Sequence, residues 1–376
     1  MKDKVLFIRD NPLLNSYPSQ TYFFATFPTK EYHWWFYENS LNLHARKSVT
    51  NGYVDFFHPI IWKMDPWIIS EKIGFDTVQH FSFPFSKLCR DALDSGKYIL
   101  TYLDRYYLRN APEYHTNHYW HEVMIYGYTE ECLYIADFRG PFVCGLEFAS
   151  DIDKAFAALI TDKLSFLSGN VTGVILFYYR EPMRYTLNYS RVAQGLYEYM
   201  EGKTSFLPVG NGIHYKYTVH PEDFIFGIQV YQFLQQYIER QVKKSVSLEE
   251  WDLRGVHLIY QHKVMIQQLL LDICINDDKT RTVFDSWKQV CDYSRMLELT
   301  LIKGVVTQRD WKVMGIVDML DVLCKKELMI LPRIVQLLED DAYHIPGMEW
   351  KQNDCKLFVE ECVTAFGLTE ETTNGK

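Results

Sequence analysis

Three runs decide the fold that this sequence predicts: Tyr98-Ile-Leu-Thr-Tyr-Leu-Asp104, His121-Glu-Val-Met-Ile-Tyr-Gly-Tyr128 and Cys132-Leu-Tyr-Ile-Ala-Asp137. Each run is short, mostly apolar and rich in β-branched or aromatic residues, which is typical of buried strands. The polar residues 129–131 join the second run to the third over a length that suits a hairpin. We therefore expect these segments to lie together in one antiparallel sheet.

Helices and a further strand are predicted on both sides of these runs. Residues 86–95 are amphipathic, with a serine at the start that can cap a helix and a glycine after the end that can stop it. Residues 151–161 also follow a helical pattern, whereas 173–179 are apolar in the manner of a strand. Residues 34–46 have apolar side chains at near-helical spacing, which predicts an early helix.

The second half of the chain has a different pattern. Residues 202–212 contain a proline and several glycines and are typical of a loop between domains. Helical periodicity follows almost to the end. The predicted helices are 222–243, 254–276, 280–303, 307–326, 327–341 and 348–366. The sequence thus predicts an α+β protein, with a sheet-containing domain at 1–185 and an all-helical domain at 186–376.

The composition argues against several classes of protein. Of 376 residues, 48% are hydrophobic and 23% are charged, as in soluble globular proteins. The net charge of −9 argues against nucleic acid as a partner, because nucleic-acid-binding proteins usually carry a basic surface. The sequence has neither a membrane-length apolar run nor the apolar core of a signal peptide. Its scattered cysteines favour free thiols, so we expect a cytoplasmic protein without a membrane partner.

His121 and Asp137 form the densest candidate site. They stand at the start and the end of the predicted hairpin, so imidazole and carboxylate are expected to meet across the sheet. A carboxylate bonded to one ring nitrogen fixes the tautomer and leaves the other nitrogen free as a base. A buried pair with a purely structural role is the alternative reading of the same residues.

A longer pattern around this pair resembles a known family. A helix ends in glycine, a strand ends in Asp104-Arg-Tyr-Tyr-Leu108, a His-x-x-x-x-x-Gly-Tyr strand follows, and its partner ends in Asp137. Over residues 85–140 the chain resembles the papain-like proteins typified by the N-terminal domain of the butirosin-biosynthesis acyltransferase. These are relatives of the bacteriocin-leader cysteine peptidases, and the resemblance implies a papain-like fold for residues 1–185.

The resemblance implies a function as well. The family belongs to natural-product gene clusters, and its characterised chemistry transfers an acyl group from a carrier-protein thioester to an amine. For this chain it implies an amide-forming acyltransferase of specialised peptide, antibiotic or other natural-product biosynthesis, without a cofactor. The implied partners are an acyl or peptidyl carrier protein and an amine-bearing small molecule or peptide. An inactive binding or scaffold protein of the same pathway is the alternative, and a peptidase or amidase is a third reading.

The chain departs from this family at the nucleophile. The family keeps a cysteine at the N-terminus of an early helix, where the helix dipole lowers the thiol pKa. Here the first cysteine, Cys89, belongs to a later helix. Alignment places either Phe36 or Ser40 at the cysteine position, depending on the landmark. Gln20, upstream of the early helix, is a candidate donor to an oxyanion.

Three explanations of the missing cysteine stay open. In the first, the domain is inactive and only binds a carrier or another partner. In the second, Ser40 is the nucleophile and His121 is its base. In the third, no covalent step is needed, because a thioester is already activated and His121 can serve as base for direct attack by the amine. We favour the third and the first over the second.

Other polar residues near the pair are candidates for substrate binding. Asp104 ends its strand within reach of the site and is a candidate to bind the amine, while Tyr106, Tyr107 and His118 are candidates to line the pocket. The H-x-x-H-x-x-H pattern that starts at residue 115 has no acidic or thiol partner at zinc-protease spacing, so we expect no metal. Residues 251–263 are similar to a helix that follows this domain in relatives, and we expect a structural helix with interdomain salt bridges there.

Overall fold

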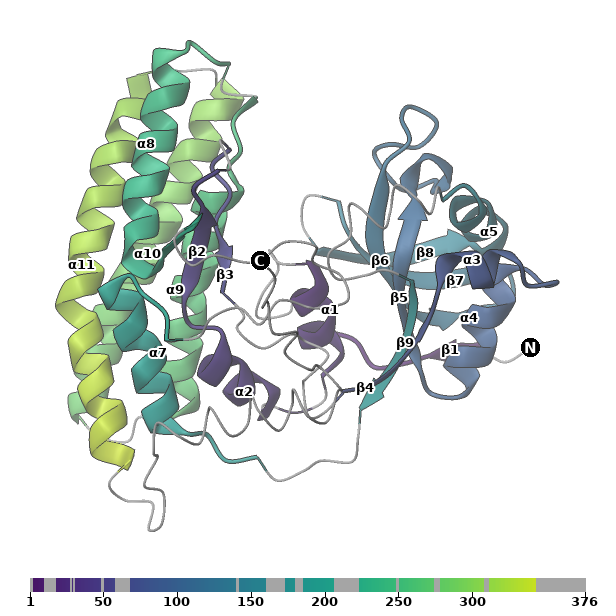
Figure 1. Ribbon diagram of the computed structural model, residues 1–376, viewed down its shortest axis with the longest axis horizontal. Helices are drawn as coiled ribbons and strands as arrows, with labels where there is room; N and C mark the ends of the chain where they lie inside the picture. The colour runs from purple at the N-terminus through teal and green to yellow at the C-terminus, as the bar shows by residue number, and fades with distance from the viewer. Residues whose placement is uncertain are drawn as a thin grey trace, which may run out of the picture.

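The computed structural model places an antiparallel sheet with short helices beside a bundle of long helices (Figure 1). It describes residues 3–9, 18–27, 29, 31–48, 51–57, 68–139, 142–159, 173–179, 185–205, 223–247, 250–273, 278–307 and 311–342. The protein is therefore α+β with a helical C-terminal region, as the sequence predicts. None of the described helices has the length and apolar composition needed to cross a membrane.

Within the described residues, the main sheet has seven strands, and every pairing in it is antiparallel. The strands are β1 Lys4–Val5, β4 Ile68–Ile73, β5 Tyr98–Asp104, β6 Trp120–Tyr128, β7 Cys132–Phe138, β8 Phe142–Phe148 and β9 Val174–Tyr179. They follow the order β4-β9-β5-β6-β7-β8, and β1 pairs with the end of β6. The three runs that predicted the sheet are thus the neighbouring strands β5, β6 and β7.

The central strands β5, β6 and β7 of the main sheet are buried on both faces. The helices beside this sheet are α1 Pro18–Thr26, α3 Phe75–Gln79, α4 Phe85–Asp94 and α5 Ala149–Ala157. Val123 and Ile125 of β6 enter the hydrophobic cluster that includes α4 and α5, whereas Met124 and Tyr126 enter the cluster that includes α1. Burial on two faces explains why these strands are continuously apolar in sequence instead of alternating with polar residues.

The start of α4 differs from the prediction, while its end agrees. Gly96 has a φ of +76°, and its N–H donates to the Leu93 carbonyl in a left-handed termination that favours glycine. At the other end, the helix begins one residue before Ser86 and has no side-chain cap. Ser86 instead donates through its N–H and its hydroxyl to Asp153, at 2.7 and 2.8 Å, and so ties α4 to α5.

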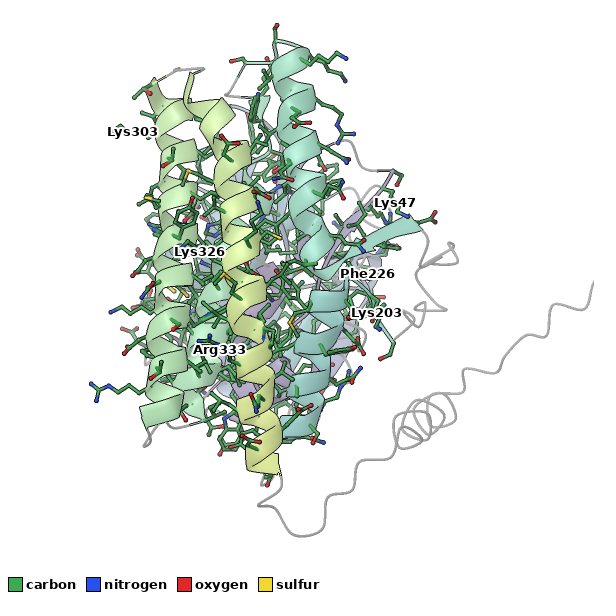
Figure 2. The ribbon with its side chains drawn as sticks, turned by 90° about the vertical axis from the view of Figure 1, so that its left-hand side faces the viewer. Lys47, Lys203, Phe226, Lys303, Lys326 and Arg333 are labelled. Atoms are coloured by element: carbon green, nitrogen blue, oxygen red, sulfur yellow. The ribbon has the colours of Figure 1, made fainter. Side chains whose placement is uncertain are left out.

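The helical region is a bundle whose long helices run side by side (Figure 2). Its helices are α7 Tyr189–Glu201, α8 Val230–Lys243, α9 Arg254–Asp272, α10 Asp278–Thr307 and α11 Trp311–Ala342. The predicted helices 307–326 and 327–341 are one helix, α11, which continues through Pro332. The predicted helix 222–243 begins only at Val230, after the strand β10 (Phe224–Phe226) and the short 3₁₀ turn Gly227–Gln229. The predicted helix 348–366 lies outside the described residues.

A small second sheet connects the N-terminal half to the bundle. Its order is β10-β2-β3, where β2 is Leu43–Arg46 and β3 is Asp55–Phe56. The predicted helix 34–46 is therefore wrong in its second half: the helix α2 covers Glu31–Asn39, and the chain then becomes β2. The cause is pairing of β2 with β10, which lies far away in the sequence.

Residues 31–57 pack against the bundle and not against the main sheet alone. α2 contacts α7 and α9, and β2 contacts α8. A side chain at Gly255 of α9 would begin 2.1 Å from the carbonyl oxygen of Gly52, so the two backbones approach as only glycine allows. His262 of α9 bonds the Leu41 carbonyl at 2.8 Å. The packing thus crosses the domain boundary predicted at residue 185.

The small sheet contains two ionisable groups on neighbouring strands, a half-buried histidine and a buried aspartate. His44 of β2 is the cross-strand partner of Asp55 of β3. Burial lowers the pKa of His44 to about 4. Burial also raises the pKa of Asp55 to about 7, although Tyr53 donates a hydrogen bond to its carboxyl group at 2.5 Å. Between about pH 4 and about pH 7 both groups are therefore mostly neutral in the folded protein.

We expect Asp55→Asn to stabilise the protein more near pH 8 than near pH 4. The folded-state pKa of Asp55, about 7, exceeds the ordinary unfolded value, so the folded protein keeps a proton that the unfolded chain has lost. Stability therefore falls as pH rises from about 4 to about 7. Asparagine removes this loss, which amounts to roughly 4 kcal/mol at most at ~1.36 kcal/mol per pKa unit. Urea denaturation at both pH values measures the difference.

A matched control separates this effect from general changes in charge. Asp91→Asn removes a carboxylate that is 57% exposed beside Lys87, and its effect should be nearly independent of pH. His44 acts in the opposite sense, because the stability linked to its neutral ring is lost as pH falls from about 6.5 to about 4. His44 is present in both proteins and cancels in the comparison. Parallel pH profiles of wild type and Asp55→Asn would contradict the prediction.

Candidate active site

Strand ends meet at one edge of the main sheet and carry the predicted site. β5 ends at Asp104, β6 begins at Trp120, and Leu103 lies opposite His121 in the register. On the other side of β6, Asp137 stands near the end of β7. Antiparallel pairing therefore brings His121 and Asp137 together, and Nδ1 of the imidazole lies 3.4 Å from Oδ1 of the carboxylate.

The hydrogen bonding of His121 defines its tautomer. Nδ1 lies 2.9 Å from the carbonyl oxygen of Glu122, in addition to its contact with Asp137. A carbonyl oxygen can only accept, so Nδ1 donates and carries the proton. In the neutral ring, Nε2 then has the lone pair of a base. The side chain is 19% exposed, so the ring reaches the surface of the protein.

Asp137 is fully buried and binds more than His121. Arg105 donates to Oδ1 at 2.5 Å, the Phe138 N–H donates at 2.7 Å, and Nε of Arg139 lies 3.4 Å from Oδ2. Burial by itself raises the pKa of Asp137, but the hydrogen bond from His121 and the charge of Arg105 outweigh it and leave the pKa below its usual value. Asp137 therefore stays ionised, and it both orients His121 and neutralises a buried arginine.

Contacts of two arginines hold the loop 105–119 together and fix it to the end of β7. Arg105 is 4% exposed, pairs with Glu113 at 3.6 Å and lies over the ring of Tyr119 at 5.4 Å. From the other side, Arg139 donates to the Asn110 carbonyl at 2.6 Å. The loop is thus fixed by charged contacts at the same edge that carries His121.

Tyr22 of α1 reaches this edge from the face of the sheet opposite to α4 and α5. Its hydroxyl donates to the Glu122 carbonyl at 2.7 Å. The same carbonyl oxygen therefore accepts hydrogen bonds from both Tyr22 and Nδ1 of His121. Burial, followed by the charge of Asp137, raises the pKa of Tyr22 well above its usual value, and the group remains a donor. Tyr22 was not predicted from the sequence, because it lies in an apolar run without charged neighbours.

The direction of α1 is set by aromatic packing. Near its start, Tyr22 packs edge-on against Phe138 of β7 at 5.7 Å. At its end, the hydroxyls of Thr26 and Tyr179 of β9 are 2.6 Å apart. The first half of α1 therefore lies toward the His121 edge. Gln20 belongs to the first turn of α1, and it lies upstream of α2, the early helix, as predicted.

Ser40 lies in different surroundings. It follows the C-terminal end of α2, its N–H donates to the Phe36 carbonyl at 2.8 Å, and its side chain is 1% exposed. The next residue, Leu41, bonds His262 of the bundle. A helix C-terminus carries a negative dipole end, which opposes formation of an anionic nucleophile. Phe36, the other aligned position, is buried in the core.

Asp104 and His118 form a second pair at the same edge. The Asp104 carboxylate is fully buried and accepts hydrogen bonds from the N–H groups of Tyr106 and Tyr119, at 3.1 and 3.2 Å, and from His118 at 2.6 Å. The Asp104 carboxylate was predicted to bind an amine substrate. In the structure it accepts hydrogen bonds from these three groups, and His118 is the side chain among them. Tyr106 stacks on His118 at 4.3 Å, and Tyr107 stands edge-on to Tyr106.

The bundle contains a closed polar cluster of its own. Lys263 of α9 and Glu327 of α11 pair at 2.7 Å with no exposure of either side chain. The hydroxyls of Tyr199 and Tyr231 donate to the same carboxylate, and Lys263 donates to Nδ1 of His262 at 2.8 Å. Burial lowers the pKa of Lys263 and, even further, that of His262. Lys263 pairs within the bundle, so the salt bridge expected between domains is not made by this residue.

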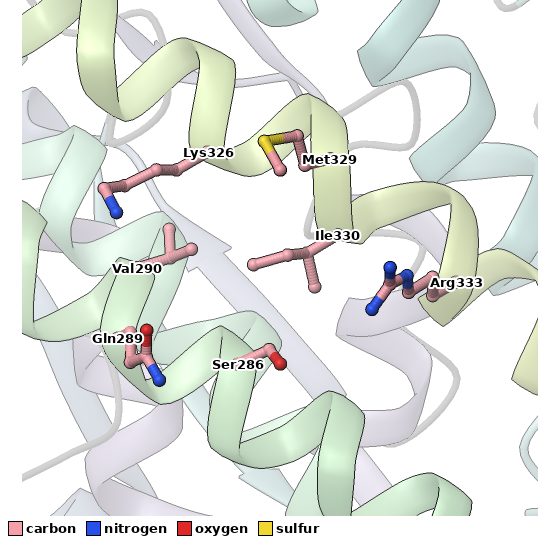
Figure 3. A pocket seen from close by; sticks show the side chains of 7 residues that line it. All are labelled: Ser286, Gln289, Val290, Lys326, Met329, Ile330 and Arg333. Atoms are coloured by element: carbon pink, nitrogen blue, oxygen red, sulfur yellow. The ribbon is translucent and has the colours of Figure 1, made fainter.

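A shallow groove lies on the surface between α10 and α11. In Figure 3, Lys326 and Arg333 stand on either side of Ile330. Its lining residues are Ser286, Gln289, Val290, Lys326, Met329, Ile330 and Arg333. Both cations belong to α11, and the other five lining residues are uncharged.

No family model matches the chain, and no curated protein matches its sequence. Within the described residues, no group of three or more histidine, cysteine or acidic side chains is placed to hold a metal ion.

Proposed function

We propose that this chain is a papain-like acyltransferase that forms an amide from a carrier-protein thioester and an amine. His121 is the general base, Asp137 orients it, and no cysteine takes part. The observation that carries the proposal is the ring of His121, whose Nδ1 is held by the Glu122 carbonyl and Asp137. This geometry leaves Nε2 as the basic nitrogen. The position of α1 across the sheet, with its first half toward His121, supports the papain-like arrangement.

The proposed step needs one proton acceptor. The amine nitrogen adds to the thioester carbonyl carbon while its proton passes to Nε2 of His121. The C–N bond forms, the C–S bond breaks, and the departing thiolate receives the proton from the imidazolium. Asp137 stabilises that imidazolium because it is ionised and 3.4 Å from Nδ1. The products are an amide and the free thiol of the carrier.

His121→Ala is expected to lower the rate of amide formation by at least about a hundredfold, the usual contribution of a general base. An acyl N-acetylcysteamine thioester and a simple primary amine serve as substrates, and mass spectrometry measures the amide. His80→Ala is the matched control, because His80 is also exposed and also bonds a carbonyl through Nδ1, but lies at the end of α3. A His121→Ala protein that folds and retains the full rate would contradict the proposal.

The two other catalytic readings predict different products. A covalent route through Ser40 predicts an acyl adduct in the intact mass that Ser40→Ala abolishes. A carrier-independent peptidase or amidase predicts hydrolysis of a peptide without any thioester.

The strongest alternative is an inactive binding or scaffold protein of the same pathway. Its supporting observation is that Asp137 lies closer to Arg105, at 2.5 Å, than to His121, at 3.4 Å. On this reading the carboxylate mainly neutralises Arg105, and His121→Ala leaves the output of the pathway unchanged. A carrier protein would still bind, and the thioester would remain intact in its presence.

A further inference from the structure

Asp104 and His118 combine a buried carboxylate with an exposed imidazole. The side chain of Asp104 is 1% exposed and that of His118 is 58% exposed, and Oδ2 lies 2.6 Å from Nδ1. The contact is shorter than the 3.4 Å between His121 and Asp137. Asp104 also lacks an arginine partner of the kind that Asp137 has in Arg105, because its other described donors are backbone N–H groups.

The backbone fixes the orientation of this pair. The N–H groups of Tyr106 and Tyr119 donate to Oδ1 of Asp104, which leaves Oδ2 for His118. An ionised carboxylate only accepts hydrogen bonds, so Nδ1 of His118 carries a proton and Nε2 is the basic nitrogen of the neutral ring. The pair therefore has the carboxylate–imidazole arrangement that makes histidine a general base.

Aromatic rings surround the exposed imidazole. Tyr106 stacks on His118 with ring centres 4.3 Å apart, and Tyr107 lies 6.1 Å from His118. His115 lies 5.2 Å from Tyr106 and adopts a φ of +54°, a backbone conformation that is rare outside glycine and is found at functional sites. A surface of this kind suits a flat aromatic group, which can pack on the rings next to Nε2.

We infer that Asp104 and His118 form a second catalytic pair, which hydrolyses activated esters that carry an aromatic leaving group. Nε2 of His118 takes a proton from water, and the water oxygen adds to the ester carbonyl carbon. The bond from that carbon to the aryl oxygen then breaks, so the acid and the phenolate leave and the imidazolium releases its proton to solvent. This activity needs no carrier protein, no amine and no His121.

Hydrolysis of p-nitrophenyl acetate by the full chain tests the inference. His118→Ala should lower the rate by at least about tenfold, within the range of general-base catalysis. Asp104→Asn should have a similar effect, because the asparagine oxygen can still accept from the backbone while its amide cannot accept from Nδ1. His80→Ala, which removes an exposed histidine that bonds only a backbone carbonyl, should leave the rate within about twofold of wild type.

Chemical rescue distinguishes catalysis from a structural role. Added imidazole should restore hydrolysis to His118→Ala in a saturable manner, whereas a variant damaged only in its fold would not respond. A His118→Ala rate within twofold of wild type, or a wild-type rate no higher than that of an equal concentration of free imidazole, would overturn the inference. This result does not depend on the thioester assay with His121→Ala, so either proposal can fail while the other stands.

Discussion

Glu327→Leu is expected to lower the free energy of unfolding by roughly 3–5 kcal/mol, the usual cost of leaving a buried charge without its partner. Lys263 has no exposure and pairs with Glu327 at 2.7 Å. The same substitution also removes the acceptor of the Tyr199 and Tyr231 hydroxyls. Urea denaturation followed by far-UV circular dichroism measures the loss, because the cluster joins helices that dominate this signal.

The double variant Lys263→Met/Glu327→Leu tests the cause. It removes both charges, so it should be more stable than the Glu327→Leu variant in spite of its second change. Lys325→Met is the matched control on the same helix, since Lys325 pairs with Asp321 at the surface, where their side chains are 71% and 51% exposed. A loss smaller than about 1 kcal/mol in Glu327→Leu would show that this cluster does not stabilise the bundle.

Arg105→Met should also destabilise the protein by about 3–5 kcal/mol, because it leaves the buried carboxylate of Asp137 without its closest cation. The loss should be smaller at acidic pH, where protonation of Asp137 removes the unpaired charge. Thermal and urea denaturation at about pH 7 and about pH 4 give the two values. The affected region is the edge of the main sheet that carries His121, so the His121 ring should lose its fixed orientation as well.

Arg109→Met is the matched control for this prediction. Arg109 belongs to the same loop and pairs with Asp151 at 2.6 Å, but its side chain is 49% exposed and water can replace it. We expect a much smaller change from its removal. A loss smaller than about 1 kcal/mol in Arg105→Met would mean that Asp137 does not depend on Arg105.

The sequence predicted four of the seven strands of the main sheet, because the signals of these four are local. The strands β5, β6, β7 and β9 are recognised from short apolar runs, and the hairpin between β6 and β7 from the polar residues that join them. Predictions failed where a distant partner decides the structure. Residues 43–46 continue a helical pattern, yet they pair with residues 224–226 of β10, and nothing near either segment indicates the other.

Part of the site was also predictable from the sequence. Hairpin geometry predicts the proximity of His121 and Asp137, and the structure places them 3.4 Å apart. Arg105 and Tyr22 were not predicted, because their contacts depend on how a loop and a helix pack against the sheet. The pairing of Asp104 with His118 was missed for a related reason: the chain turns back after Tyr107, and spacing in the sequence does not show which residues meet there.

The packing of residues 31–57 on the bundle has a consequence for the order of events during synthesis. This segment leaves the ribosome well before its partners in α9, such as His262 and Gly255, which follow roughly 200 residues later. At about 5–20 residues per second, the segment waits for some 10–40 s with its aromatic side chains uncovered. During this interval α4, α5 and the main sheet can already assemble. A later part of the chain thus completes the folding of this segment.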